Sequence, residues 1–218
     1  MTGPAENGGP AGGRVIAVVP VRGGANGKSR LAPDLGAEER ERLVGVLARH
    51  VVTTLLAVVD RVVVVTADLS STRRAVGADV RLDVIEQSRE GLNGAVADGC
   101  DFAFSGRAAR VAVMHADLPL LDPTDVLALV TAEAPVVLAP DHAREGTNAI
   151  ALDRGLAAWR FRFGQGSFAE HAAEAERHGV APFVLQRPGL GVDLDTPGDW
   201  EALPGDARDA LRRLIRSG

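Results

Sequence analysis

Tyrosine is absent from this sequence, and tryptophan and phenylalanine are scarce, with two and six copies in 218 residues. The core must therefore be aliphatic, and few rings are available to stack on bases, which argues against a nucleic-acid partner. The chain also lacks a run of basic residues, and its formal net charge is −5. Such a chain binds polyanions poorly unless a metal ion or a glycine-rich loop handles the phosphates.

Cysteine occurs once, as Cys100, so no disulfide can form within the chain. This usage suits a reducing compartment, and the apolar neighbours of Cys100 favour a buried bystander over a catalytic thiol. The first residues lack the charged-then-apolar pattern of a signal peptide, and no apolar stretch reaches the ~18 residues of a membrane span. We therefore expect a cytoplasmic protein with no membrane partner.

Lysine is nearly absent as well, because Lys28 is the single lysine among 24 basic residues. Other positions evidently accept Arg. A position that keeps Lys suggests a need for a compact, flexible point charge rather than a planar guanidinium, and chance is the alternative explanation.

The length fits one α/β domain. Residues 1–13, rich in Gly, Pro and Ala, are expected to form a disordered arm, and residues 14–218 the domain. Apolar runs predict strands, and helical spacing predicts helices. The expected strands span 15–19, 62–66, 80–85, 110–114, 136–139, 149–152, 183–185 and 191–194, and the expected helices span 38–59, 91–104, 168–178, 206–215 and a segment that begins at Asp122. This alternation predicts a mainly parallel sheet with helices on both faces, which binds ligands at the carboxyl ends of its strands.

The first loop that follows a strand, residues 20–31, holds three Gly together with Arg22, Lys28 and Arg30. Glycine lets backbone amides approach phosphate oxygens, and the cations offset phosphate charge. A true P-loop needs a glycine six residues before its lysine, and that position is Arg22. We therefore expect a triphosphate-binding loop of another kind, with a solvent-exposed hairpin as the alternative.

Three acidic residues follow predicted strands. Asp117 comes just after the strand 110–114, and Asp193 and Asp195 alternate along an extended segment, so their side chains should face one way. If the three converge, a divalent cation such as Mg²⁺ would relieve their repulsion. The alternative is a role in turns or helix caps, although Thr196 is the expected cap of the next helix.

Two further loops could bind a small anion. Residues 146–148 follow a predicted strand, and residues 163–168 place two Gly before a helix. Ser167 and Glu170 have the spacing of a capping box, which is the structural reading. A capped helix start also presents free amides to an anion, so the phosphate or carboxylate of a small acid is a compatible ligand.

Asn93 and the histidines give weaker signals. Asn93 could bind a base edge, or it could serve the start of its helix equally well. The histidines show no metal-ligand spacing, and surface or capping roles are expected for all five: His50, His115, His142, His171 and His178.

Five motifs in order carry a resemblance to a known family, across roughly residues 14–200. They are residues 20–22 with 28–31, then 116–120, 146–149, 163–168 and 193–197. Together they resemble the phosphoenolpyruvate / 2-phospho-L-lactate guanylyltransferases of deazaflavin coenzyme F-420 biosynthesis. Arg22 stands where the family usually has Lys, and Gly23-Gly24 where bulkier residues are common.

The resemblance implies a Rossmann-like nucleotidyltransferase fold with a mixed sheet, and transfer of GMP from GTP to phosphoenolpyruvate. It implies that Mg²⁺ is held by Asp117, Asp193 and Asp195. Arg22, Lys28 and Arg30 would face the triphosphate, and Thr147, Gly164 and Ser167 would contact the acid.

Several alternatives stay open at this point. 2-Phospho-L-lactate or 3-phosphoglycerate could replace phosphoenolpyruvate, and a sugar-phosphate or molybdopterin-type nucleotidyltransferase could share the fold. A non-catalytic nucleotide-binding protein is a further alternative. The family context suggests that the product passes to a downstream transferase, and the oligomeric state is open.

Overall fold

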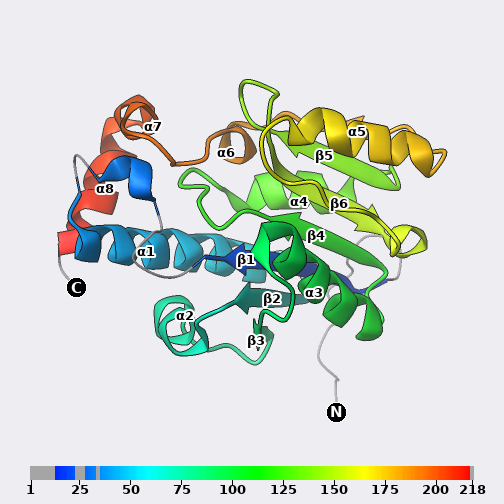
Figure 1. The fold of residues 1–218 in the computed structure, drawn as a ribbon, viewed down its shortest axis with the longest axis horizontal. Coiled ribbons are helices and arrows are strands. Elements are labelled where there is room, and N and C mark those ends of the chain that lie inside the picture. The colour runs from blue at the N-terminus through cyan, green and yellow to red at the C-terminus, as the bar shows by residue number, and fades with distance from the viewer. Residues whose placement is uncertain (1–12, 23–27, 33–34, 217–218) are drawn as a thin grey trace, which may run out of the picture.

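The structure is a computed structural model that describes residues 13–22, 28–32 and 35–216. In this part of the chain the strands form one sheet in the order β3-β2-β1-β4-β6-β5-β7 (Figure 1). Only β6 runs antiparallel to its described neighbours, β4 and β5. The predicted mainly parallel mixed sheet is therefore confirmed. The strands are β1 Val15–Val21, β2 Arg61–Thr66, β3 Leu82–Glu86, β4 Arg110–Met114, β5 Val136–Pro140, β6 Thr147–Asp153 and β7 Phe183–Val184.

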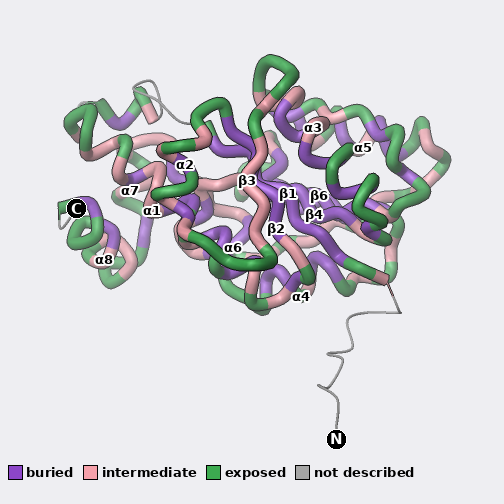
Figure 2. The backbone as a smooth tube through the Cα atoms, turned by 90° about the horizontal axis from the view of Figure 1, so that it is seen from below, coloured by how far each residue is buried: buried purple, intermediate pink, exposed green. Residues whose placement is uncertain are grey.

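Helices cover both faces of the sheet, as predicted. Figure 2 shows α3 and α5 on one side of the strands and α4 and α6 on the other. Alternate residues of β1 enter two separate hydrophobic clusters, because successive side chains of a strand point to opposite faces. The helices are α1 Ala37–Leu56, α2 Leu69–Val76, α3 Gly91–Ser105, α4 Pro123–Thr131, α5 Ser167–Arg177, α6 Pro188–Gly191, α7 Pro197–Ala202 and α8 Gly205–Arg216.

A third hydrophobic cluster lies between α1 and α8 and matters most for the site. It buries Leu31 and Leu194, which are 1% and 0% exposed. Leu31 ends a short 3₁₀ turn that begins just after Lys28, and Leu194 stands between Asp193 and Asp195. Because these leucines anchor their segments in the core, the flanking charged residues are held at fixed places on its edge.

The expected element boundaries hold within a few residues, with two exceptions. The helix α2 was missed, because it is short and mostly polar; Asp68 caps it by accepting a hydrogen bond from the Ser71 amide at 3.0 Å. The strand expected at residues 191–194 is wrong. Gly191 ends the one-turn helix α6, and the next residues bond to loops instead of a sheet, with the Leu194 amide donating to the Asp117 carbonyl at 3.0 Å.

Other expectations concern the cap residues, the cysteine and the membrane. Asp122 and Thr196 cap α4 and α7 as predicted. Cys100 is buried, and burial raises the pKa of its thiol, which fits an inert residue. Among the described residues no helix is both long and apolar enough to cross a membrane. Residues 1–12 of the expected arm lie outside the described part of the chain.

Candidate active site

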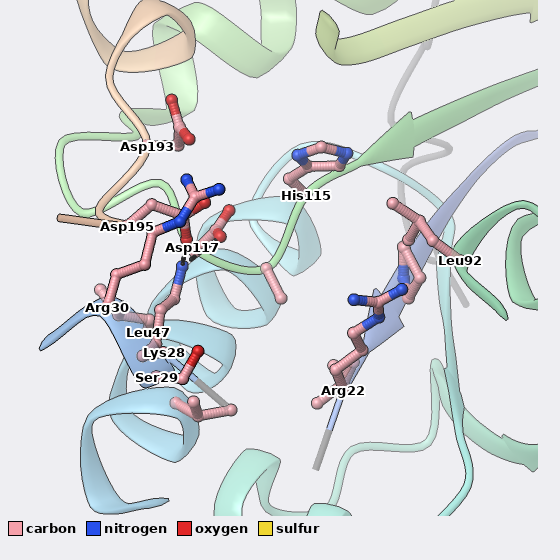
Figure 3. Close-up of a pocket in the computed structure, with 14 residues that line it drawn as sticks. Arg22, Lys28, Ser29, Arg30, Leu47, Leu92, His115, Asp117, Asp193 and Asp195 are labelled. Carbon is pink, nitrogen blue, oxygen red and sulfur yellow. Dashed lines mark hydrogen bonds and ion pairs between the residues drawn. The ribbon is translucent and has the colours of Figure 1, made fainter. Parts of the chain in front are cut away.

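A cavity of about 380 Å³ opens at the carboxyl ends of β1 and β4 (Figure 3). In the sheet, β2 and β3 lie on one side of β1, and β4 lies on the other, so the strand order reverses between β1 and β4. Open α/β sheets bind ligands at such a reversal. The residues that line the cavity are Pro20, Val21, Arg22, Lys28, Ser29, Arg30, Val44, Leu47, Leu92, His115, Ala116, Asp117, Asp193 and Asp195.

The single lysine lies at the centre of the charged part of this cavity. Its ammonium donates a hydrogen bond to Asp117 Oδ2 and another, of 2.5 Å, to Asp195 Oδ1, and its side chain is only 8% exposed. Burial alone would lower the pKa of Lys28, but the two carboxylates outweigh it and raise the pKa above its usual value. Lys28 is therefore a fixed positive charge, which favours the functional interpretation of the chain's single lysine over chance.

The backbone of Lys28 is also unusual. Its φ of 56° lies in the left-handed region, which residues other than Gly and Asn adopt rarely. Such conformations cost free energy and cluster at functional sites. Residues 23–27, which hold the glycines of the predicted phosphate-binding loop, lie outside the described residues.

Asp117 follows β4 and makes only part of its possible contacts. Burial would raise the pKa of its carboxyl group, but the charge of Lys28, followed by that of His115, holds the pKa below its usual value. Asp117 is therefore ionised at neutral pH. Its Oδ1 atom is buried and has no hydrogen-bond partner among the described residues. A buried carboxylate oxygen without a partner is rare in folded proteins and requires an explanation.

Asp193 and Asp195 differ in their surroundings. Burial, followed by the negative charge of Asp117, raises the pKa of Asp193, and Asp195 adds to this effect. Neither residue caps the following helix, because its N-cap is Thr196, whose hydroxyl accepts from the Asp199 amide at 3.2 Å. Asp117, Asp193 and Asp195 all line one cavity, as predicted; that they hold a metal ion together stays a prediction.

A metal ion can be tested against this arrangement. Throughout the described ranges, no three Asp, Glu, His or Cys side chains are grouped as a ready metal site. The donor set nevertheless fits a hard divalent cation, since hard cations prefer carboxylate oxygens. The unpartnered oxygen of Asp117 and the crowded negative charge around Asp193 both call for added positive charge.

Two arginines flank this centre. Figure 3 shows Arg30 on the side of the cavity that carries Asp195, and Arg22 across the cavity beside Leu92. Arg22 directly follows β1, and Arg30 belongs to the 3₁₀ turn after Lys28. The three predicted phosphate-binding cations therefore lie around one cavity.

The residues predicted to contact the acid lie together, outside the set that lines the cavity. Thr147 begins β6 and Ser167 begins α5, and both are 1% exposed. A methyl group added to Gly146 would lie 4.0 Å from Ser167 Oγ, and the Ser167 amide donates to the Gly164 carbonyl at 3.1 Å. The structure thus brings 146–147 next to 164–167.

The capping box predicted for this helix is wrong. Gly166, with a φ of 72°, is the N-cap residue of α5, and Ser167 is already in the first turn. Glycine can adopt this left-handed conformation without strain. Ser167 is therefore buried inside the helix start and does not close it with its hydroxyl group.

Asn93 has a structural partner at both ends of its amide. Its Nδ2 donates to the Phe163 carbonyl at 3.1 Å, and its Oδ1 accepts from the Phe163 amide at 2.7 Å. Asn93 therefore ties α3 to the loop that carries Gly164. The prediction that it reads a base edge stays a prediction, and this pairing favours the structural reading.

The surface or capping roles expected for the histidines are wrong for His115 and His171. His171 is fully buried, and burial, followed by the nearby His115, lowers its pKa to about 4. Its Nε2 accepts from the Arg162 amide at 3.0 Å, so the proton of the neutral ring is on Nδ1, which donates to Thr147 Oγ1 at 3.1 Å.

His115 lines the cavity, which the sequence reasoning did not anticipate. The signal that could have found it is its place, two residues before Asp117 and directly after a buried strand. For His171 the signal is its helical spacing, four residues after Ser167 on the face of α5 that packs inward.

Comparison with known proteins agrees with this geometry. Residues 15–209 match the family described as "Guanylyl transferase CofC like". A phosphoenolpyruvate guanylyltransferase of Sphaerobacter thermophilus is 41% identical over 88% of this chain and 93% of its own length. A 2-phospho-L-lactate guanylyltransferase of Methanothermobacter thermautotrophicus is 33% identical over 92% of this chain and 91% of its own.

Solved structures show the same fold at low sequence identity. A putative nucleotide-diphospho-sugar transferase from Desulfovibrio desulfuricans superposes with a TM-score of 0.76 at 16% identity, covering 93% of this chain and 96% of that chain. A 4-diphosphocytidyl-2C-methyl-D-erythritol synthase from Anaerococcus prevotii superposes with a TM-score of 0.64 at 13% identity, covering 93% and 100%. With a matching fold, a carboxylate–lysine centre and a family match over most of its length, the chain belongs to the CofC-like guanylyl transferase family and is a nucleotidyltransferase.

Proposed function

We propose that this enzyme transfers GMP from GTP to phosphoenolpyruvate, releases pyrophosphate and forms enolpyruvyl-diphospho-guanosine for coenzyme F-420 biosynthesis. The observation that carries the proposal is the convergence of Lys28, Asp117 and Asp195 in a cavity that also holds Arg22 and Arg30. Phosphoenolpyruvate is favoured as the acid because the relative named for it is 41% identical, against 33% for the 2-phospho-L-lactate enzyme.

The nucleotide end of the reaction would use the cations of the cavity. Arg22 and Arg30 face the triphosphate, and the ammonium of Lys28 supplies a compact charge that does not titrate near neutral pH. Side-chain cations that are already in place need no reorganisation when charge shifts toward the leaving pyrophosphate. The apolar side chains of Val44, Leu47 and Leu92 give the cavity a wall against which a nucleoside can pack.

Asp117, Asp193 and Asp195 would hold Mg²⁺. When bound, the ion supplies charge neutralisation for the phosphates. Asp117 contributes the buried oxygen that has no described partner, and the ion would offset the charge that raises the pKa of Asp193. Lys28 helps to hold the pKa of Asp117 below its usual value, and its two hydrogen bonds orient the carboxylates of Asp117 and Asp195.

The chemical step is a displacement at phosphorus. A phosphate oxygen of the acid attacks the α-phosphorus of GTP, a new P–O bond forms, and the bond to the bridging oxygen breaks as pyrophosphate leaves. The acid's phosphate is already ionised at neutral pH, so neither a strong general base nor a covalent enzyme intermediate is needed. The protein's contribution is orientation and charge stabilisation.

The acid would be held by Thr147, Gly164 and Ser167. These residues lie together, outside the set that lines the cavity, and Phe163, which precedes Gly164, contacts the ring of His115. His171 donates to the Thr147 hydroxyl, which leaves the hydroxyl's own proton available for an anion. The site is therefore suited to a small acid with negative charge.

Pyrophosphate release tests this proposal directly. The enzyme is given Mg²⁺ with GTP, ATP, CTP or UTP, each paired with phosphoenolpyruvate, 2-phospho-L-lactate or 3-phosphoglycerate. We expect the highest kcat/KM for GTP with phosphoenolpyruvate. Preference for another of the three acids would correct the acceptor, and no release with any of the pairs would contradict the function.

A further inference from the structure

The ring of His115 carries a buried polar atom that the proposed mechanism has not used. His115 directly follows β4 and lines the cavity. Its Nε2 is buried and has no hydrogen-bond partner in the described part of the chain. A buried nitrogen without a partner destabilises the fold unless a ligand supplies the missing hydrogen bond.

The ring is also held in a defined orientation. The His115 amide donates to the Asn148 carbonyl at 3.0 Å, which ties the residue to β6. The ring packs against Phe163, with 5.1 Å between centroids and a tilt of 47°. Phe163 is fixed in turn by Asn93, through hydrogen bonds to its amide and carbonyl. A ring held in this way can place a donor accurately, which a mobile surface histidine cannot.

His115 lies between the part of the site proposed for the nucleotide and the part proposed for the acid. Asp117 is two residues further along the chain, and Phe163 immediately precedes Gly164. Figure 3 shows the ring beyond the end of β4, between the carboxylates and Leu92. In the proposed function the carboxylates serve the nucleotide and Gly164 binds the acid. His115 therefore lies where the attacking group of the acid must meet the nucleotide.

We propose that His115 Nε2 donates a hydrogen bond to the phosphate of the acid and holds its attacking oxygen beside the nucleotide. This inference rests on the proposed function and adds a substrate-binding residue to it. The phosphate is the ligand, and not the acid's carboxylate, because the phosphate carries the attacking oxygen and has to reach the nucleotide, whereas Thr147 and Ser167 are almost fully buried and outside the set that lines the cavity.

Two amide substitutions test which ring nitrogen matters. The side-chain amide of Gln reaches the place of Nε2, whereas that of Asn reaches only the place of Nδ1. We expect His115→Gln to keep a KM for the acid close to that of the unmodified enzyme. His115→Asn should raise this KM by roughly 10- to 100-fold, the range for a lost hydrogen bond to a charged group. The KM for GTP should stay the same in both variants.

Three outcomes would overturn the proposal. They are a larger rise of the KM for the acid in His115→Gln than in His115→Asn, an equal rise in both variants, and an unchanged KM for the acid in His115→Asn. Melting temperatures show whether both variants fold. A second readout needs no turnover: the ¹⁵N resonance of His115 Nε2 should shift when the acid is added with a non-hydrolysable GTP analogue, and not with the analogue alone. Lack of that shift contradicts the assignment. Failure of the unmodified enzyme to release pyrophosphate would instead contradict the proposed function.

Discussion

At the residue scale, the account depends most on Lys28. Lys28 is the only lysine of the sequence, and the structure places its ammonium between two carboxylates inside the cavity. Lys28→Ala should lower kcat/KM for GTP by about 100-fold or more, as expected when a fixed charge that stabilises the transition state is removed. Steady-state pyrophosphate release measures this. Arg49→Ala, which removes an exposed cation from α1, is the control and should have no effect.

Lys28→Arg should rescue little of this loss. The planar guanidinium cannot replace a compact ammonium that donates to two carboxylates. If the Arg variant were as active as the unmodified enzyme, the presence of Lys rather than Arg at position 28 would be explained by chance.

Asp193 offers a test that separates function from stability. Burial and the negative charge of Asp117 both disfavour the charged form of Asp193, and they raise its pKa. Asp193→Asn removes that unfavourable charge while keeping the side chain's shape. We therefore expect GMP transfer to be lost while the melting temperature stays equal or rises. Thermal unfolding in the absence of metal, together with the transfer assay, measures both. Full activity in this variant would contradict its role as a metal ligand.

The low pKa of His171 predicts how the stability of the protein depends on pH. Its folded-state pKa, about 4, lies below the unperturbed value of 6.5, so the unfolded chain takes up the proton first as the pH falls. Its contribution to stability is therefore full above pH 6.5 and is lost on acidification toward pH 4. Between pH 7 and pH 5 the free energy of unfolding should fall by roughly 2 kcal/mol on this account.

Urea unfolding of His171→Gln tests this at both pH values. The variant should be less sensitive to acid than the unmodified protein, whereas His142→Gln, at an exposed position, should keep the original sensitivity. An unchanged pH dependence in His171→Gln would show that His171 is not the buried neutral group described here.

At the scale of elements, apolar strands were the most predictable part. The strand 110–114 has the bounds of β4, and the alternation of Asp193 and Asp195 around a buried Leu194 puts both acids on the cavity side. The backbone of 191–194 was not predictable, because its hydrogen bonds go to loops that are distant in sequence. Ser167 was misread because Gly166 takes a left-handed conformation that composition alone does not reveal.

The turn between β5 and β6 gives a prediction at this scale. Asp141 Oδ2 accepts from the Gly146 amide at 2.7 Å, and a methyl group on Gly146 would come within 2.8 Å of that oxygen. Gly146→Ala must therefore displace the Asp141 carboxylate, whose hydrogen bonds to the Glu145 and Gly146 amides close the turn before Thr147. We expect a loss of about 1–3 kcal/mol in stability and a higher KM for the acid, with the KM for GTP unchanged.

Gly155→Ala is the matched control, because an added methyl group there meets no atom within 4 Å. Chemical unfolding and steady-state kinetics compare the two variants. Equal effects of both substitutions, or an unchanged KM for the acid in Gly146→Ala, would show that the turn does not position the acid.

At the scale of the whole molecule, the sequence predicted the fold class and the convergence of distant segments. Lys28, Asp117 and Asp195 meet because β1 and β4 are neighbours and because Leu31 and Leu194 share one hydrophobic cluster. Strand order and the antiparallel direction of β6 could not be predicted, since they depend on long-range packing that local patterns do not encode. The role of His115 was missed for the same reason.

The proposed transfer of GMP to phosphoenolpyruvate is tested by the mass of the product. The enzyme is incubated with GTP, Mg²⁺ and equal amounts of phosphoenolpyruvate, 2-phospho-L-lactate and 3-phosphoglycerate, and the products are identified by mass spectrometry. We expect enolpyruvyl-diphospho-guanosine as the main product with the unmodified enzyme and none with Asp117→Asn. Intact GTP after incubation with the unmodified enzyme, a main product made from either of the other two acids, or an undiminished yield with Asp117→Asn would contradict it.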